Sequence, residues 1–201
     1  MIALLDYGAG NIRSVQNALH RLGVSAALTH DPATVLAADK VIFPGVGAAG
    51  PAMAQLRATG LDTLIPQLQQ PLLGICLGMQ LMCRHSAEGD VAGLGIFDAP
   101  VLRFPATGKV PHMGWNDCTD LHGPLFTGAA VGTAPDLPGP VGTYYFVHSY
   151  YVPLCGETAA TCDYLLPFSA ALQRANFYAV QFHPEKSGPH GQALLHNFLR
   201  L

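Results

Sequence analysis

The chain has 201 residues, half of them hydrophobic and 11% charged, with a formal net charge of −3 at pH 7. A chain of this length buries a full core as one domain, and we expect a single domain over residues 1–201. The scattered Lys and Arg residues argue against a surface for nucleic acid. Five cysteines without regular spacing favour a reducing compartment, and the N-terminus carries no signal-peptide pattern, so we expect a cytoplasmic protein.

Strands and helices are predicted to alternate along the first half of the chain. Apolar runs predict strands at Ile2–Leu5, Val41–Phe43 and Pro71–Ile75, and each run leads into a glycine-containing turn and a helical pattern. After the first run, Asn11 and Gly23 are expected to begin and end a helix, because the apolar residues between them fall on one helical face. This alternation is typical of an α/β fold with a largely parallel sheet.

The second half of the chain is richer in β-forming residues. The runs Thr143–Val152, Ala159–Tyr164 and Phe177–Phe182 lie close in sequence, which favours antiparallel or mixed pairing, and Gly191–Leu201 predicts a final helix. Gly123–Gly142 is rich in Pro and Gly and predicts a long surface loop. The predicted fold is one α/β domain whose central, mostly parallel or mixed sheet is flanked by helices.

A possible dinucleotide-binding loop follows the second predicted strand, where Gly45, Gly47 and Gly50 form a G-x-G-x-x-G pattern. That fingerprint also requires an acidic residue about 20 positions later, at the end of the next strand. The next predicted strand ends without a carboxylate, and Asp62 comes too early, within a helical stretch. A nucleotide site is therefore disfavoured.

Metal binding is disfavoured as well. Cys76, Cys83 and His85 are spaced as C-x6-C-x-H, which is not a usual zinc pattern, and no second pair of ligands completes a site. We therefore expect neither a metal nor another cofactor.

The stretch Gly74-Ile75-Cys76-Leu77-Gly78 has the G-x-nucleophile-x-G form of a strand-to-helix elbow. The elbow would present Cys76 at a helix N-terminus, where the helix dipole and free N–H groups favour a thiolate. The backbone N–H of Leu77 would point into the same space as an oxyanion-hole donor. The alternative interpretation is a small buried cysteine with a structural role.

A cysteine nucleophile needs a base and a group that orients the base. In residues 179–187, His183 and Glu185 lie two positions apart, and Pro184 favours an extended backbone that projects both to one side. His112 and His148 are the rival histidines; neither has a carboxylate close in sequence, so each is expected to be structural.

The stretches GICLGMQ and QFHPEKS resemble the class I (triad) glutamine amidotransferases, which have a flavodoxin-like α/β fold. Within that family, four further stretches resemble the glutaminase subunits of imidazole glycerol phosphate synthases, namely residues 4–15, 43–53, 109–116 and 145–152. The resemblance runs from the first strand to the last helix. It implies that Cys76 attacks the side-chain amide of glutamine, that His183 is the general base, and that Glu185 orients it.

The resemblance also implies binding residues and a partner. The implied oxyanion-hole residues are Val46, Gly47 and Leu77. The implied substrate-binding residues are Gly47, Gln80, Glu88, Ser149 and Tyr150. The implied partner-facing residues are Asn11, Trp115 and Lys186. That partner is a cyclase subunit with a (β/α)8-barrel fold, which uses the ammonia to form imidazole glycerol phosphate and aminoimidazole carboxamide ribotide in histidine biosynthesis.

The glycine-rich loop is then interpreted as an oxyanion strand. Gly45 and Gly47 are expected to let the peptide between Val46 and Gly47 rotate at little steric cost, so that its N–H turns toward the site when partner and substrate bind. Gly50 becomes incidental. Two departures from the family pattern stand out: Ala49 replaces an aromatic residue, and the segment between residues 128 and 143 is longer than expected.

Three other functions are compatible with parts of the pattern. The chain could be the glutaminase subunit of another amidotransferase, such as that of anthranilate or pyridoxal phosphate synthesis. It could be a catalytically silent binding module that keeps the fold, although the intact Cys-His-Glu set argues against this. A cysteine hydrolase of the same fold is disfavoured by Gln80 and Glu88, which match glutamine-contacting positions.

Overall fold

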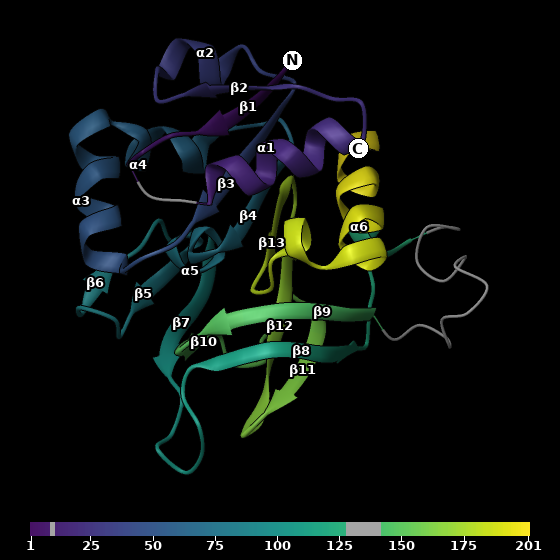
Figure 1. The fold of residues 1–201 in the computed structure, drawn as a ribbon. Helices are drawn as coiled ribbons and strands as arrows, with labels where there is room; N and C mark the ends of the chain where they lie inside the picture. The colour runs from purple at the N-terminus through teal and green to yellow at the C-terminus, as the bar shows by residue number, and fades with distance from the viewer. Residues whose placement is uncertain (9–10, 128–141) are drawn as a thin grey trace.

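The computed structural model describes residues 1–8, 11–127 and 142–201 (Figure 1). The predicted surface loop at Gly123–Gly142, and the extra chain length in the same region, fall largely outside the described residues. At the two ends of that segment, the structure has a 3-10 helix, η2 (Pro124–Phe126), and a strand that starts at Gly142.

A large mixed sheet forms the centre of the fold, with the strand order β2-β1-β3-β4-β13-β12-β11-β8-β9. Its parallel part comprises β2 (Ala26–Thr29), β1 (Ile2–Leu5), β3 (Lys40–Gly45), β4 (Leu72–Cys76) and β13 (Phe177–Val180). Its antiparallel part continues from β13 with β12 (Leu166–Arg174), β11 (Thr158–Tyr164), β8 (His112–Thr119) and β9 (Gly142–His148). With β13 counted as a fifth strand, the parallel part has the 2-1-3-4-5 order of flavodoxin-like folds, which confirms the predicted fold class.

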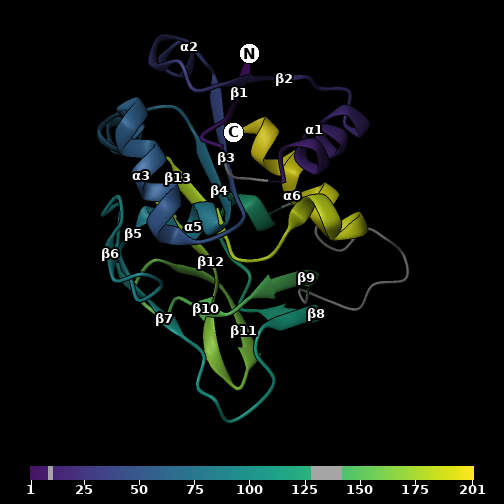
Figure 2. The ribbon, with the colours of Figure 1, turned by 60° about the vertical axis from the view of Figure 1, so that its left-hand side comes forward.

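Helices cover both faces of the parallel strands because successive strand residues point to opposite faces. In β1, Leu4 belongs to the core on one face and Leu5 to the core on the other. The Leu4 face is covered by α1 (Ile12–Arg21) and α6 (Gly188–Arg200), and the Leu5 face by α3 (Ala49–Thr59) and α5 (Leu77–Met82) (Figures 1 and 2). Within the described residues, no helix is both long and apolar enough to cross a membrane.

A smaller, separate sheet has the order β10-β7-β5-β6. Its strands are β10 (Tyr150–Tyr151), β7 (Phe97–Arg103), β5 (Cys83–Ser86) and β6 (Val91–Ala92). The remaining helical segments are α2 (Pro32–Leu36), α4 (Leu61–Leu64), η1 (Ile65–Gln67) and η3 (Pro184–Lys186).

The structure corrects the predicted β run Thr143–Val152. The chain leaves the large sheet after His148 and enters the small sheet at Tyr150, so one apolar run serves two sheets. Ser149 lies at the crossing, and its carbonyl accepts a hydrogen bond from the N–H of Phe104 at 3.1 Å. The run is rich in β-forming residues on both sides of Ser149, so its composition cannot reveal such a crossing.

Of the two predicted ends of the first helix, the stop at Gly23 is confirmed, whereas Asn11 starts the helix without a side-chain cap. Gly23 ends α1 with a positive φ of 76°, its N–H donates to the carbonyl of His20, and the N–H of Val24 donates to that of Leu19. These two bonds form a Schellman motif and confirm the predicted stop. Asn11 occupies the N-cap position, but among the described residues its side chain caps no backbone N–H of the helix.

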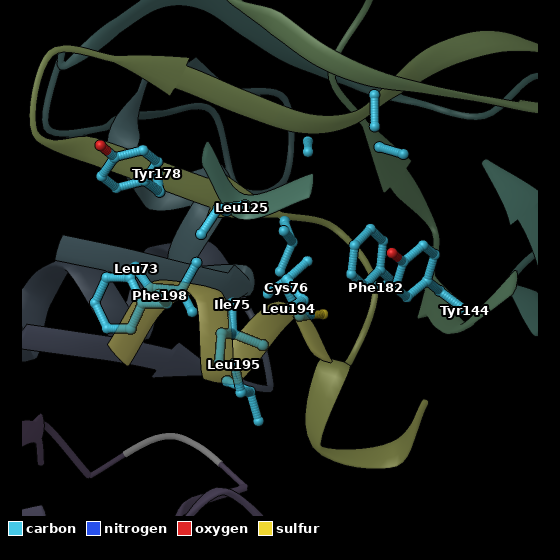
Figure 3. Packing of buried hydrophobic residues seen from close by; sticks show 14 of the residues in the cluster. Leu73, Ile75, Cys76, Leu125, Tyr144, Tyr178, Phe182, Leu194, Leu195 and Phe198 are labelled. Carbon is cyan, nitrogen blue, oxygen red and sulfur yellow. The ribbon is translucent and has the colours of Figure 1, made fainter. Parts of the chain in front are cut away.

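Two contacts fix the C-terminal elements against the sheet. Figure 3 shows Leu73 and Ile75 of β4 beside the side chains that α6 directs at them, which are Leu194, Leu195 and Phe198. Phe182, just after β13, stacks on Tyr144 of β9 with ring centroids 3.9 Å apart. The chain that follows Phe182 is therefore held next to the end of β4.

Candidate active site

The elbow at Cys76 has the predicted strand-to-helix geometry. Cys76 is the last residue of β4 and the N-cap of α5, with φ 55° and ψ −109°. Positive φ is costly for a residue with a side chain and tends to occur at functional positions. The positive φ lies on Cys76 itself, whereas the flanking glycines Gly74 and Gly78 allow α5 to pack closely against the sheet. A Cβ on Gly78 would lie 2.0 Å from the carbonyl oxygen of Phe43.

The predicted base and its orienting carboxylate are joined by a hydrogen bond. Nδ1 of His183 lies 2.8 Å from Oε1 of Glu185, and both side chains are buried. The backbone N–H of His183 donates to the carbonyl of Tyr145 at 2.9 Å, which fixes the residue against β9. Because a carboxylate only accepts, Nδ1 carries a proton and Nε2 is the atom left for exchange with a ligand.

The surroundings of His183 favour its charged form. Burial alone would lower the pKa of this imidazole, but hydrogen bonds and negative charge from Cys76 and Glu185 outweigh burial and raise the pKa to about 10. At neutral pH a protonated His183 therefore lies beside the Cys76 sulfur, which is the charge arrangement of a cysteine nucleophile.

A cavity of about 340 Å³ opens over Cys76 and His183. Its volume suits a small amino acid. The side chains and backbone that line it are Val46, Gly47, Cys76, Leu77, Gln80, Glu88, Pro111, Val147, His148, Ser149, Tyr150, His183 and Lys186. The structure thus brings the predicted oxyanion-hole and substrate-binding residues to one cavity, with Glu185 behind His183.

The glycine-rich loop after β3 borders this cavity. Gly47 has a φ of +101°, and no described atom lies within 4 Å of the place where its Cβ would be. Gly45 is different, because a side chain there would have no room. A Cβ at Gly45 would lie 2.6 Å from Oη of Tyr7 and 2.7 Å from the backbone nitrogen of Gly78. Gly45 is therefore required for close packing, and only Gly47 provides unusual backbone freedom.

The polar residues predicted to hold glutamine are themselves held by the protein. Nε2 of Gln80 donates to the carbonyl of Tyr150 at 3.0 Å and to Oε1 of Gln181 at 2.9 Å. Oε2 of Glu88 accepts from the N–H of Ala49, at the start of α3, at 2.9 Å. These bonds fix both side chains, and they use neither Oε1 of Gln80 nor the second carboxylate oxygen of Glu88.

The predicted partner-facing residues lie near the mouth of the cavity. Trp115 is 57% exposed and does not belong to the protein's own core. Its ring meets Tyr145 edge to face, and Nζ of Lys186, which lines the cavity, lies 6.0 Å from the Tyr145 ring centroid. Asn11 donates from Nδ2 to Oε1 of Glu185 at 3.3 Å, which links it directly to the catalytic set.

Gln181 is the site residue that the sequence analysis missed. It is fully buried, and its Nε2 lies 3.8 Å from Sγ of Cys76. β13 ends at Val180, and Glu185 lies in the 3-10 helix η3 and not on the extended backbone that was predicted, so no strand alternation links Gln181, His183 and Glu185. No local pattern therefore marked Gln181 as a neighbour of Cys76. The rival histidines His112 and His148 bond to each other at 3.0 Å and are buried, as expected of structural residues, although His148 also borders the cavity.

Known proteins match the chain over its whole length. The family model described as glutamine amidotransferase class-I matches residues 3–201. The chain is 57% identical to imidazole glycerol phosphate synthase subunit HisH of Bacteroides thetaiotaomicron, covering 100% of this chain and 99% of that protein. It is 47% identical to the protein of the same name in Yersinia pestis, with the same coverage of both chains.

Two solved structures share the fold at low identity. PurLQS from Thermotoga maritima is 15% identical, with a TM-score of 0.73, and the match covers 99% of this chain and 97% of that one. A structure described as glutamine amidotransferase is 19% identical, with a TM-score of 0.72 and the same coverage. These structures show the fold, and the family model and the full-length relatives show that the chain belongs to the class I glutamine amidotransferases and, within them, to the family of imidazole glycerol phosphate synthase subunit HisH.

Proposed function

We propose that this chain is the glutaminase subunit of an imidazole glycerol phosphate synthase and that Cys76, His183 and Glu185 hydrolyse glutamine to glutamate and ammonia. The observation that carries the proposal is the cavity in which Cys76, on a strand-to-helix elbow, and the buried His183–Glu185 pair meet. Residues 1–201 act as one amidotransferase domain, and the chain works in the cytoplasm.

The chemistry starts from a thiolate beside a protonated imidazole. The sulfur of Cys76 attacks the side-chain carbonyl carbon of glutamine, and the N–H groups of Leu77 and Gly47 stabilise the negative oxygen that forms. His183 then gives its proton to the departing ammonia, and Glu185 keeps the ring oriented. In the second half, His183 takes a proton from water, which attacks the glutamyl thioester and releases glutamate and the thiolate.

Charge complementarity assigns the ends of the substrate. The free carboxylate oxygen of Glu88 and Oε1 of Gln80 are acceptors and bind the α-ammonium group of glutamine. The backbone of Ser149 and Tyr150, whose carbonyls are already bonded within the protein, offers its N–H groups to the α-carboxylate. The amide end of glutamine then reaches Cys76.

The ammonia passes to a partner that docks at the mouth of the cavity. Trp115, Lys186 and Asn11 face this cyclase subunit, a (β/α)8 barrel that makes imidazole glycerol phosphate and aminoimidazole carboxamide ribotide. An exposed Trp is the kind of side chain that anchors protein interfaces.

A reconstitution assay tests the proposal. The chain is mixed with the cyclase subunit and its ribonucleotide substrate, and glutamate release is measured with and without each component. We expect release to depend on the partner; equal activity of the isolated chain would contradict the coupling. Complementation of a histidine auxotroph that lacks this subunit separates the proposal from a role in anthranilate or pyridoxal phosphate synthesis.

A further inference from the structure

One backbone carbonyl, that of Tyr150, joins two side-chain networks beside the active-site cavity. It accepts a hydrogen bond from Nε2 of Gln80 at 3.0 Å and another from Nδ1 of His148 at 2.7 Å. A carbonyl oxygen can only accept, so it fixes which end of the Gln80 amide and which tautomer of His148 face it. The side chains that are hydrogen-bonded to Gln80 and His148 are oriented as a consequence.

The first network runs from the carbonyl to the nucleophile. Nε2 of Gln80 also donates to Oε1 of Gln181 at 2.9 Å, so the oxygen of Gln181 is turned toward Gln80. The nitrogen of Gln181 must then face the other way, where it lies 3.8 Å from Sγ of Cys76. Gln181 is fully buried, so water does not compete with the sulfur for its N–H.

The second network runs from the carbonyl away from the nucleophile. Nε2 of a neutral His148 accepts from Nδ1 of His112 at 3.0 Å, and Nε2 of His112 accepts from Nδ2 of Asn116 at 3.3 Å. Burial lowers the pKa of His148 to about 3 and that of His112 to about 4. Both rings therefore stay neutral, and every donor in the network meets an acceptor.

We propose that Gln181 is a further catalytic residue, whose side-chain N–H donates to the Cys76 sulfur and stabilises its thiolate. His148 and His112 are positioning residues, which act by holding the Tyr150 carbonyl in place. The inference rests on the proposed function of Cys76 as the nucleophile. A hydrogen bond to an anion is about twice as strong as one to a neutral group, so the N–H favours the thiolate over the thiol and over the later thioester.

Alkylation of Cys76 tests the inference without glutamine or a partner. Gln181→Met keeps the side-chain length and removes the N–H donor. The rate of alkylation by iodoacetamide is followed at the Cys76 peptide by mass spectrometry from about pH 5 to about pH 10. We expect the midpoint of this profile to move up by about one pH unit, with a roughly tenfold slower reaction below the midpoint.

The matched control is Gln192→Met, which makes the same change on the exposed face of α6. Its profile should coincide with that of the unmodified protein. A Gln181→Met profile that also coincides with it would overturn the inference. If Gln181→Met shifts the profile but the unmodified protein has no glutaminase activity with its partner, the proposed function is contradicted. The contact between Gln181 and the Cys76 thiolate is supported in that case.

A second measurement does not depend on how well Gln181→Met folds. The side-chain amide resonances of Gln181 in the unmodified protein should move with pH at the midpoint of the alkylation profile. In Cys76→Ser they should stay fixed, because the hydroxyl does not ionise in this range. Resonances that fail to follow the thiol in the unmodified protein would overturn the inference as well.

The positioning role has its own readout. His148→Phe removes the donor to the Tyr150 carbonyl, whereas His148→Gln restores a side-chain N–H. We expect the phenylalanine variant to shift the alkylation profile in the direction of Gln181→Met and the glutamine variant to move it back toward that of the unmodified protein. Equal profiles for the two variants would show that His148 acts only by packing.

Discussion

Replacement of Gly45 by alanine should destabilise the protein strongly, whereas the same replacement at Gly50 should stabilise it, although both belong to one G-x-G-x-x-G pattern. At Gly45, the new Cβ would lie 2.6 Å from Oη of Tyr7 and 2.7 Å from both the Gly78 nitrogen and the Leu77 Cβ. Two of these atoms belong to the elbow helix α5, and they can make room for the new Cβ only if α5 moves away from β3.

The magnitudes follow from packing and backbone preference. Overpacking of a core costs about 1–3 kcal/mol, and a clash with backbone belongs at the upper end, so we expect about 3 kcal/mol for Gly45→Ala. At Gly50, which lies in α3, no described atom is within 4 Å of the added Cβ. Alanine should gain about 0.5–1 kcal/mol there by restricting the unfolded chain and favouring the helix.

Thermal and urea unfolding measure both variants against the unmodified protein. For a chain of this size, 1 kcal/mol corresponds to a change of roughly 2–4 °C in Tm, so Gly45→Ala should lower Tm by about 6–12 °C and Gly50→Ala should raise it by about 2 °C. A Tm for Gly45→Ala within about 1 °C of the unmodified protein would refute the reasoning from close approach, as would equal losses at the two positions.

The remaining predictions concern the site. Cys76→Ala should lower the pKa of His183 from its value of about 10, because the hydrogen bond and charge of the sulfur are lost; an unchanged imidazole titration by NMR would contradict this. The pKa of His183 in the folded protein lies above the usual 6.5, so the protonated ring stabilises the fold. This stabilisation is fully present below pH 6.5 and is lost as the pH rises through about 10. The urea midpoints of the unmodified protein and His183→Gln should therefore converge from pH 6 to about pH 10, and a constant gap would argue against the shift. Gly47→Pro should abolish glutamine-dependent turnover and spare ammonia-dependent turnover by the complex, because proline cannot adopt a φ of +101°; normal glutaminase activity would defeat this expectation. Trp115→Ala should weaken binding of the cyclase subunit by about 2 kcal/mol in titration calorimetry, and an unaltered Kd would remove Trp115 from the interface.

Much of the catalytic set was predictable because it lies in short local patterns. The elbow around Cys76 is specified within five residues, and His183 and Glu185 are two residues apart, so neither required knowledge of distant contacts, although Glu185 lies in a 3-10 helix and not on the extended segment that was expected. The strand–helix alternation and the glycine stop at Gly23 are likewise local. These features predicted the α/β fold and the chemistry of a cysteine nucleophile.

The contacts that join distant segments were not predictable in this way. The run Thr143–Val152 stays rich in β-forming residues while it changes sheets at Ser149, and this crossing brings the Tyr150 carbonyl to Gln80. Gln181 was overlooked because its significance depends on a sulfur more than a hundred residues away in sequence.

The sequence by itself determined the fold class and pointed to the proposed nucleophile and base, since the strand–helix alternation, the elbow and the histidine–glutamate spacing act over a few residues. Only the tertiary structure decided what each glycine of the loop is for: Gly45 lies against the elbow helix, Gly47 turns the backbone, and Gly50 has open space where a Cβ would lie. The physical reason is that a glycine's role depends on the atoms packed against it, and those atoms come from other strands and helices.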